Sequence, residues 1–255
     1  MTTTPLDQTG FVVNGEPASV RADHPHLLAA LREELNITSP KDGCSPSGHC
    51  GACTVLVDGK AIQSCLVGLE KAAGKEITTL EGFPAEDRAR LANAFAAAGA
   101  LQCGFCTPGI MVRTKALLDQ KGKDLTRETA AGRLGGHLCR CTGYTKIFEA
   151  IEMLRDDAIP DVVMPGGVGT RGAKYQATEL ALGDRGYVDD MRPDGLLHAA
   201  LKLSDHARAD VLRIDTGPAL AIEGVIAVFT AADVPGELRV GIIYEDWPVF
   251  IPEGG

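Results

Sequence analysis

Eight cysteines are the residues of this sequence best suited to chemistry, and they fall into two groups of four. The first group has the spacing C-x5-C-x2-C-x11-C, and the second has the spacing C-x2-C-x32-C-x-C. The sequence after residue 141 contains no cysteine. The first group consists of Cys44, Cys50, Cys53 and Cys65, and the second consists of Cys103, Cys106, Cys139 and Cys141.

Metal binding is the interpretation that this cysteine pattern favours. Four disulfides are disfavoured because a chain of 255 residues does not need covalent staples. The N-terminus also has no secretory signal, so we expect a cytoplasmic protein in a reducing compartment. Unligated thiols at this density would repel one another as thiolates and would oxidise. Four cysteines per group suit either structural zinc or a [2Fe–2S] cluster.

The spacing of the first group favours iron–sulfur over zinc. Zinc knuckles use two short C-x2-4-C arms, whereas this group has three cysteines in one loop and a distant fourth, as in plant-type ferredoxins. Gly43, Gly48 and Gly51 allow positive φ and can turn backbone N–H groups toward sulfur. For the second group, the residues alone leave zinc and iron–sulfur equally open.

The segments around the first group predict a small mixed α+β domain over residues 1–82. Asn14-Gly15 and Asp58-Gly59 each separate two extended runs, which is typical of β-hairpins. An apolar stripe over residues 27–35 predicts a helix between the hairpins. The second hairpin carries Cys65 back toward the cysteine loop.

The segments around the second group predict a helical domain over residues 83–158. Four alanine-rich or periodic runs indicate four short helices, and the cysteines lie in the loops between them. Ile147, Ile151 and Leu154 are expected on one face of the last helix. The runs cover residues 85–103, 106–122, 125–136 and 144–158.

The remainder of the chain predicts a linker and a third segment. Residues 159–173 are rich in glycine and proline and are interpreted as a linker. Residues 174–255 are interpreted as an incomplete domain with strands and short connections. The predicted strands cover residues 186–191, 196–204, 210–215 and 225–234.

Three motifs in the first 158 residues resemble the iron–sulfur portion of the molybdenum hydroxylases, the xanthine oxidase and aldehyde oxidoreductase family. They are GCSPSGHCGACTVLVDG, ALQCGFCTPGIM and LCRCTGY. The resemblance implies a β-grasp ferredoxin domain followed by a four-helix domain, each holding one [2Fe–2S] cluster on its four cysteines. It therefore favours iron–sulfur for the second group as well. Residues 186–236 are similar to the start of the family's α/β hammerhead domain.

The resemblance also implies a function and partners. It implies that electrons from a molybdopterin site pass through the second cysteine group and then the first, to FAD on another chain or to an external acceptor. It places Gln102 and Cys141 beside the pterin. The family's later segments, with the molybdenum site and its catalytic glutamate, are not in this sequence. We therefore expect a molybdenum-binding large subunit as partner, with FAD possible on a further subunit, and assign no catalytic residue here.

The bulk composition and several single residues narrow the function further. The formal net charge of −9 and the lack of a basic run argue against nucleic-acid binding, and no apolar stretch is long enough to span a membrane. No G-x-G-x-x-G follows a strand, so no flavin or dinucleotide site is predicted. His49 and His137 are interpreted as loop residues rather than ligands. Asp189-Asp190 is not interpreted as a catalytic pair, because adjacent residues on a strand point apart.

The first cysteine gap differs from the family pattern, which commonly has four residues where this chain has five. Ser45-Pro46 favours a turn, so we expect a bulge ahead of Gly48 that preserves ligation. Two alternatives remain beside the electron-transfer subunit. They are a free ferredoxin-like carrier and a zinc-binding interaction module. The sequence leaves open whether the substrate is an aldehyde, a purine or another N-heterocycle.

Overall fold

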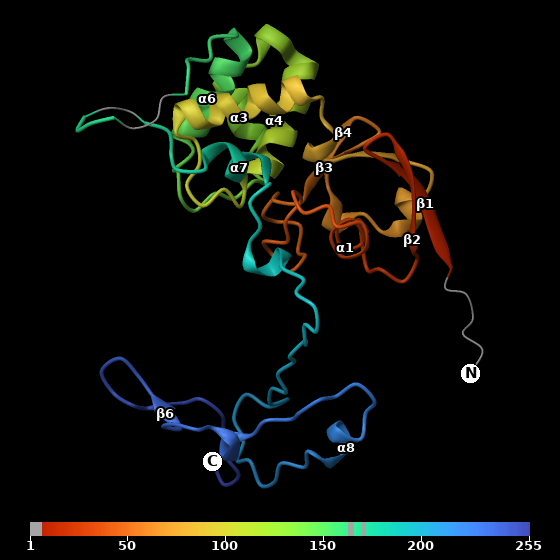
Figure 1. Ribbon diagram of the computed structural model, residues 1–255, viewed down its shortest axis with the longest axis vertical. Helices are drawn as coiled ribbons and strands as arrows, with labels where there is room; N and C mark the ends of the chain where they lie inside the picture. Colours follow the sequence, from red (N-terminus) through yellow and green to blue (C-terminus); the bar gives the residue numbers. More distant parts are fainter. Residues whose placement is uncertain (1–6, 163–165, 170–171) are drawn as a thin grey trace. The chain divides into compact units, whose positions relative to one another are not determined.

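The computed structural model describes residues 7–162, 166–169 and 172–255, and the chain divides after Arg192 into two compact units. Unit 1 contains all eight cysteines and consists of a β-sheet module and a helical module (Figure 1). Unit 2 begins at Pro193. The predicted linker over residues 159–173 lies partly outside the described residues.

The β-sheet module is a five-stranded mixed sheet in the order β2-β1-β5-β3-β4. Strand β5 lies in the centre, parallel to β1 and antiparallel to β3, and joins the two predicted hairpins into one sheet. The sequence did not predict β5, because three residues carry too little periodicity. The strands are β1 (Gln8–Val13), β2 (Glu16–Arg21), β3 (Thr54–Val57), β4 (Lys60–Gln63) and β5 (Glu76–Thr78).

Both hairpins turn at the predicted dipeptides. Asn14 and Gly15 have φ of +53° and +86°, and Asp58 and Gly59 have φ of +47° and +75°. Positive φ at both central residues is the geometry whose twist matches antiparallel strands. Helix α1 (Leu27–Ala29) continues into the π-helical turn η1 (Ala30–Glu34) and covers one face of the sheet. The core is formed by buried side chains that include Phe11, Val20, Leu27, Leu31, Val55 and Ile77.

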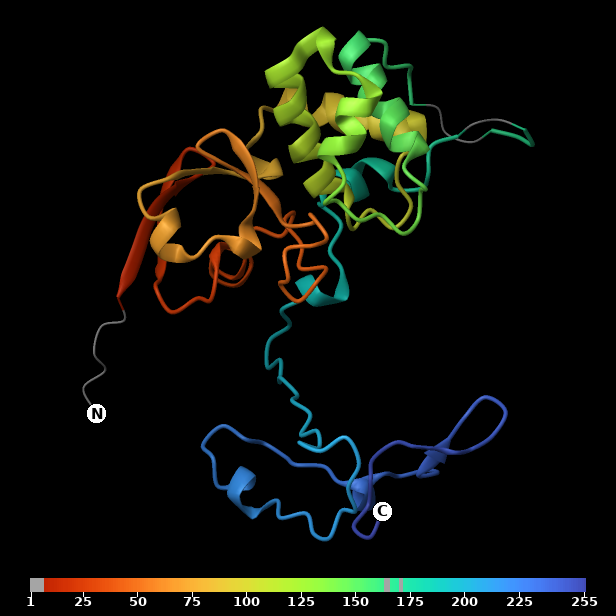
Figure 2. The ribbon, with the colours of Figure 1, turned by 180° about the vertical axis from the view of Figure 1, so that it is seen from behind.

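The helical module contains the four predicted helices, which lie beside the sheet (Figures 1 and 2). Helix α3 packs against α6 and α7, and its buried face is mostly alanine, so the helices approach closely. As predicted, Ile147, Ile151 and Leu154 are buried together. The helices are α3 (Ala85–Ala98), α4 (Thr107–Lys121), α5 (Arg127–Arg133) and α6 (Thr145–Asp156), with the short helix α7 (Ala177–Leu182), whereas the short helix α2 (Leu69–Ala72) packs in the sheet module.

The two modules of unit 1 meet where helix α4 packs against strands β3 and β4. Gly109 in the first turn of α4 makes this approach possible. A Cβ at Gly109 would lie 2.5 Å from the carbonyl oxygen of Gly51. Any side chain there would push the helix away from the cysteine loop of the sheet module. This contact places the two cysteine groups on neighbouring loops.

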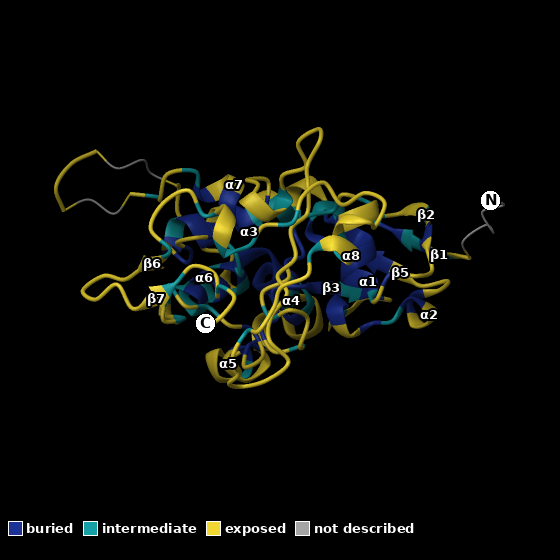
Figure 3. Cartoon of the chain, turned by 90° about the horizontal axis from the view of Figure 1, so that it is seen from below, coloured by how far each residue is buried: buried dark blue, intermediate teal, exposed yellow. Residues whose placement is uncertain are grey.

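Unit 2 has little regular structure, and its residues are almost all exposed (Figure 3, yellow). Its elements are α8 (Gly217–Leu220), the 3₁₀ turn η6 (Ala231–Asp233) and the paired strands β6 (Arg239–Val240) and β7 (Trp247–Pro248). The strands predicted at 196–204, 210–215 and 225–234 are therefore wrong. The strand predicted at 186–191, in unit 1, is also wrong, since the 3₁₀ turn η5 (Val188–Asp190) lies there. A strand needs a neighbouring strand, and among the described residues none pairs with these runs; only Val211 makes backbone hydrogen bonds with the 254–255 segment.

Candidate metal centres

The first cysteine group lies at the end of the sheet that faces the helical module. Cys44, Cys50 and Cys53 occupy the loop before β3, and Cys65 lies in the 3₁₀ turn η2 (Ser64–Leu66) directly after β4. Because β3 and β4 form an antiparallel hairpin, its two ends bring Cys53 and Cys65 together. Cys44 is half-buried and the other three are buried.

The five-residue gap is accommodated by a turn at the predicted place. Ser45 has φ of +53°, and the backbone N–H of Ser47 donates to the carbonyl of Cys44 at 3.2 Å. The carboxylate of Asp42 accepts from the N–H groups of Cys44 and Ser45, at 3.2 Å and 2.8 Å. The extra residue is thus contained in a local turn ahead of Gly48.

The second cysteine group lies between helices. Cys103 and Cys106 are in the loop from α3 to α4, where Cys106 is the residue just before α4. Cys139 and Cys141 are in the loop that precedes α6. The Sγ atoms of Cys103 and Cys141 lie 3.6 Å apart. Cys103 is exposed and the other three are half-buried.

In both groups the thiols are arranged as pairs. Two thiolates held about 2.3 Å from one tetrahedral metal lie about 3.8 Å apart, which the 3.6 Å separation approaches. Within residues 7–162, 166–169 and 172–255, no three Cys, His, Asp or Glu side chains converge on a point that could hold one ion. Two pairs of thiols per group fit the four thiolates that hold the two irons of a [2Fe–2S] cluster. Besides burial, a neighbouring thiol raises the pKa of one member of each pair: Cys44 acts on Cys50, Cys53 on Cys65, Cys141 on Cys103, and Cys139 on Cys106.

Backbone N–H groups point at the sulfurs of the first group. Burial opposes ionisation of Cys44, but the Ser47 hydroxyl and the N–H groups of His49 and Cys50 lower its pKa to about 6. Burial and the neighbouring Cys53 thiol raise the pKa of Cys65 to about 12. Donors that favour thiolate therefore coexist with burial that disfavours it. A bound cation resolves this conflict, since a metal keeps thiolates deprotonated.

The second group has the same conflict. Burial and the nearby Cys139 thiol raise the pKa of Cys106. For Cys139, burial is outweighed by hydrogen bonds from the side chain and backbone of Thr142, which lower its pKa. The Cys139 Sγ and Thr142 Oγ1 atoms lie 3.1 Å apart. The donor set therefore fits an anionic sulfur-ligated group in both places.

Glycines make room for the first loop. Gly48 and Gly51 have φ of +74° and +68°, as predicted, but Gly43 does not have positive φ. A Cβ at Gly43 would instead lie 3.1 Å from the Cys50 sulfur and 3.0 Å from the Phe105 ring. Gly43 is therefore required for close approach rather than for backbone conformation.

The loops of the two groups are joined by direct contacts. The N–H of Leu138 donates to the carbonyl of Cys50 at 2.9 Å. The Nε2 atom of buried His137 lies 3.0 Å from the Thr54 hydroxyl. Burial and the charge of Arg113 lower the pKa of His137 to about 4, so this imidazole is neutral near pH 7. His137 joins the two modules here.

Three family models match consecutive parts of the chain. "2Fe-2S iron-sulfur cluster binding domain" matches residues 11–80, "[2Fe-2S] binding domain" matches 79–152, and "Aldehyde oxidase and xanthine dehydrogenase, a/b hammerhead domain" matches 182–251. The nicotinate dehydrogenase small FeS subunit of Eubacterium barkeri is 44% identical over 141 residues, covering 54% of this chain and 88% of that protein. The chain belongs to the molybdenum hydroxylase family.

Longer members of the molybdenum hydroxylase family match more of the chain. The aldehyde oxidoreductase of Megalodesulfovibrio gigas is 35% identical over 251 residues, covering 91% of this chain. The crystal structure of the aldehyde oxidoreductase from Desulfovibrio desulfuricans superposes with a TM-score of 0.80 at 32% identity, covering 92% of this chain. This chain spans 28% of the length of each. The predicted family and fold class are confirmed.

Gln102, which the resemblance to molybdenum hydroxylases placed beside the pterin, has a partner within the chain. Its Nε2 atom donates to the carbonyl of Cys141 at 2.9 Å, which ties the two halves of the second group together. Gln102 and Cys103 also line a cavity of about 420 Å³ together with Lys174, Arg185 and Tyr187. A contact between Gln102 and a pterin stays a prediction.

Two residues that the sequence did not assign hold the second group in place. The N–H of Cys139 donates to the Tyr144 hydroxyl at 2.9 Å, and that hydroxyl donates to the carbonyl of His137 at 2.9 Å. Thr142 contacts the Cys139 sulfur, as described above. Only their position in the motif LCRCTGY could have indicated this role. Residue type alone does not indicate it, because a tyrosine in a loop is more often simply packed.

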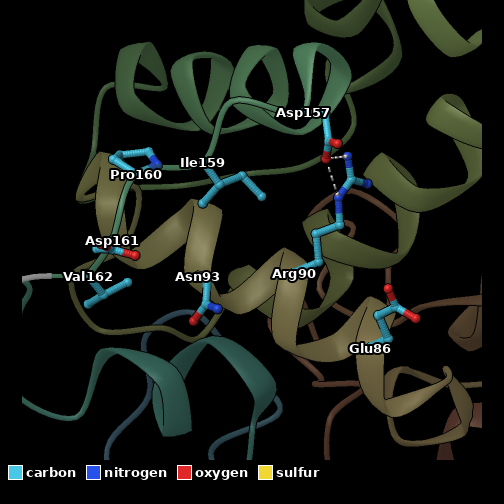
Figure 4. Close-up of a pocket in the computed structure, with 8 residues that line it drawn as sticks. All are labelled: Glu86, Arg90, Asn93, Asp157, Ile159, Pro160, Asp161 and Val162. Atoms are coloured by element: carbon cyan, nitrogen blue, oxygen red, sulfur yellow. Dashed lines mark hydrogen bonds and ion pairs between the residues drawn. The ribbon is translucent and has the colours of Figure 1, made fainter.

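Another cavity, of about 490 Å³, lies away from the cysteines, between α3 and the segment after α6 (Figure 4). Arg90 and Asp157 form an ion pair at 2.9 Å on its wall. No cysteine lines it.

Among the described residues, no helix is long and apolar enough to cross a membrane.

Proposed function

We propose that this chain is the iron–sulfur electron-transfer part of a molybdenum hydroxylase. The observation that carries the proposal is the arrangement of each four-cysteine group as two pairs of thiols beneath hydrogen-bond donors. The proposed ligands are Cys44, Cys50, Cys53 and Cys65 for one [2Fe–2S] cluster and Cys103, Cys106, Cys139 and Cys141 for the other. When bound, such clusters accept and release one electron at a time.

The residues of this chain have three tasks in that function. The cysteines supply thiolates, and the N–H groups of the loops stabilise negative charge on sulfur, which tunes the reduction potential. The contact between Leu138 and Cys50 keeps the two loops adjacent. Cys50, Cys53 and Cys65 are buried away from water, and Leu28 of α1 packs with Cys53 and Cys65.

We infer that electrons enter at the second cysteine group and leave from the first. Cys103 is exposed beside the cavity lined by Gln102, so this side is open to a donor. The donor is proposed to be a molybdopterin cofactor, contacted by Gln102 and Cys141. The acceptor is proposed to be FAD on another subunit or an external carrier.

The reaction and partners are proposed from the names of the relatives. Relatives are named for nicotinate, xanthine and aldehyde, and a solved one for quinoline. The substrate class proposed here is an aldehyde, a purine or another N-heterocycle, oxidised at a molybdenum site outside these residues. Because several relatives are named as small or iron–sulfur-binding subunits, the proposed partner is a molybdenum-binding large subunit. A cytoplasmic location stays a prediction.

Metal and sulfide analysis of the purified chain tests the proposal. Two [2Fe–2S] clusters predict about four iron and four acid-labile sulfide per chain, with a brown colour and two reduced-state paramagnetic signals. A colourless protein with about two zinc per chain would instead support the zinc-binding module. A monomer that purifies with iron but without a molybdenum-containing partner would support the free carrier.

A further inference from the structure

A segment that begins with helix α7 contacts the Cys103 loop of the helical module and residues 32–41 of the sheet module. We call residues 177–190 the clasp segment. A Cβ at Gly104, between Cys103 and Cys106, would lie 2.9 Å from the Leu180 Cβ. A Cβ at Gly183 would lie 3.2 Å from Ser39 of the sheet module and 3.3 Å from Pro108 of α4. The clasp segment is therefore in close contact with both modules.

Tyr187 is the residue of the clasp segment that touches the second cysteine group. Its hydroxyl donates to the carbonyl of Cys103 at 2.5 Å. Its ring meets Phe105 edge-on at 5.5 Å between centroids, and the Lys41 ammonium lies 5.3 Å from the ring centre. Cys103 is the exposed member of its group, so this hydrogen bond holds a loop that otherwise faces solvent.

Asp190 holds Tyr187 in that position. One oxygen of its carboxylate accepts from the Tyr187 backbone N–H at 2.8 Å. The other lies 2.6 Å from the Arg32 guanidinium, and Lys41 is 3.6 Å from the carboxylate. The side chains of Asp190, Arg32 and Lys41 are only 6%, 8% and 2% exposed. Two buried cations of the sheet module thus have the buried carboxylate of Asp190 as their shared ion-pair partner, and Glu81 acts on Lys41 as a further carboxylate.

Removing one member of a buried ion pair leaves a charge without compensation, and this is costly. Arg32 retains its hydrogen bonds to the carbonyls of Thr38 and Pro40, and Lys41 retains one to Thr38. Neither set supplies negative charge. Neighbouring Asp189 lies 3.4 Å from Arg32 but is 88% exposed, so it is a poor substitute. The clasp segment is therefore anchored at Asp190.

We propose that Tyr187 is a positioning residue for the Cys103 loop, and that Asp190, through Arg32 and Lys41 of the other module, anchors Tyr187. The proposal rests on the electron-transfer function proposed above. It makes the electronic environment of the second cluster depend on residues beyond both cysteine groups. The Tyr187 hydroxyl draws electron density from the Cys103 carbonyl oxygen and so lessens the negative potential that this oxygen places beside the proposed cluster. Less negative potential stabilises the more negative reduced state, so the hydrogen bond raises the reduction potential.

Two variants of the full chain, in the complex with which it purifies, test the proposal. Tyr187→Phe keeps the ring contacts and removes only the hydrogen bond. We expect a lower reduction potential for the second-group signal and an unchanged one for the first-group signal. Asp190→Asn removes the anchor, and backbone amides of residues 103–106 should exchange with solvent roughly 100-fold faster. Asp189→Asn, the matched control, should change neither measurement.

Iron and sulfide content separates this test from that of the proposed function. If the wild-type chain contains no iron and no acid-labile sulfide, the proposed electron-transfer function is contradicted. If the variants retain full iron and sulfide, an unchanged second-group potential in Tyr187→Phe overturns the role of Tyr187. Amide exchange as slow in Asp190→Asn as in Asp189→Asn overturns the anchor. Equal shifts of both signals in Tyr187→Phe would show a general structural effect and would also overturn the proposal.

Discussion

The two cysteine groups have the same number of thiols but are built in different ways. Three thiols of the first group lie in one short loop, and the fourth is returned by a hairpin. The second group joins two loops separated by helices α4 and α5, and it is more exposed. The first group is therefore assembled largely by local structure and the second by helix packing. The difference suits the proposed direction of electron flow, in at the accessible second group and out at the sheltered first group.

Loss of one ligand should produce the largest effect and should separate the two groups. Replacing Cys53 by Ser removes a buried thiolate from the first group. We expect its paramagnetic signal to vanish while the second-group signal persists, because the two sets share no ligand. Electron paramagnetic resonance of the reduced protein measures this. Loss of both signals in a folded variant would contradict two independent centres.

The next largest effect is expected when a side chain is added at Gly51, where the loops of the two cysteine groups touch. Gly51→Ala adds a Cβ 2.5 Å from the Gly136 carbonyl at a residue with φ of +68°, so strain and steric overlap combine. We expect a loss of about 3 kcal/mol in unfolding free energy, measured by denaturant titration.

Gly59→Ala is the matched control for that variant. Gly59 has φ of +75°, but a Cβ there would meet open space. Gly59→Ala should therefore lower the free energy of unfolding by only about 1 kcal/mol. Equal losses at Gly51 and Gly59 would show that the contact between the loops is loose.

Gln102→Ala should affect only the second cysteine group, and its effect should be smaller than those of Cys53→Ser and Gly51→Ala. It removes the hydrogen bond to the Cys141 carbonyl and leaves all eight cysteines in place. Both signals should remain, and turnover of the assembled enzyme should fall about fivefold, the equivalent of one hydrogen bond. Unchanged turnover would count against a contact between Gln102 and the pterin.

Ser47→Ala should give the smallest effect, confined to the first group. The Ser47 hydroxyl is one of the donors that lower the pKa of Cys44. Its removal should lower the first-group reduction potential by about 40 mV or less, taking roughly 1 kcal/mol per hydrogen bond and 59 mV per tenfold. Redox titration measures the change. A shift of the second-group potential instead would show that the two signals have been assigned to the wrong groups.

The sequence predicted those elements that local chemistry specifies. The hairpins at Asn14-Gly15 and Asp58-Gly59 follow from residues that tolerate positive φ, and the four helices follow from periodicity. It did not predict strand β5 or helix α7, which are short and are stabilised by neighbours distant in sequence. It assigned strands to unit 2 that the structure does not contain, because extended runs need pairing partners.

The sequence by itself determined which residues are proposed as ligands. Eight cysteines at these spacings, with glycines between them, predict two four-thiolate sites. Only the tertiary structure decided how the thiols pair, which group is sheltered, and that Tyr187, held by Asp190, contacts the Cys103 loop. The physical reason is the distance in sequence over which each kind of interaction acts. Ligand identity and turn geometry are local properties, whereas burial and ion pairing depend on which distant segments fold against each other.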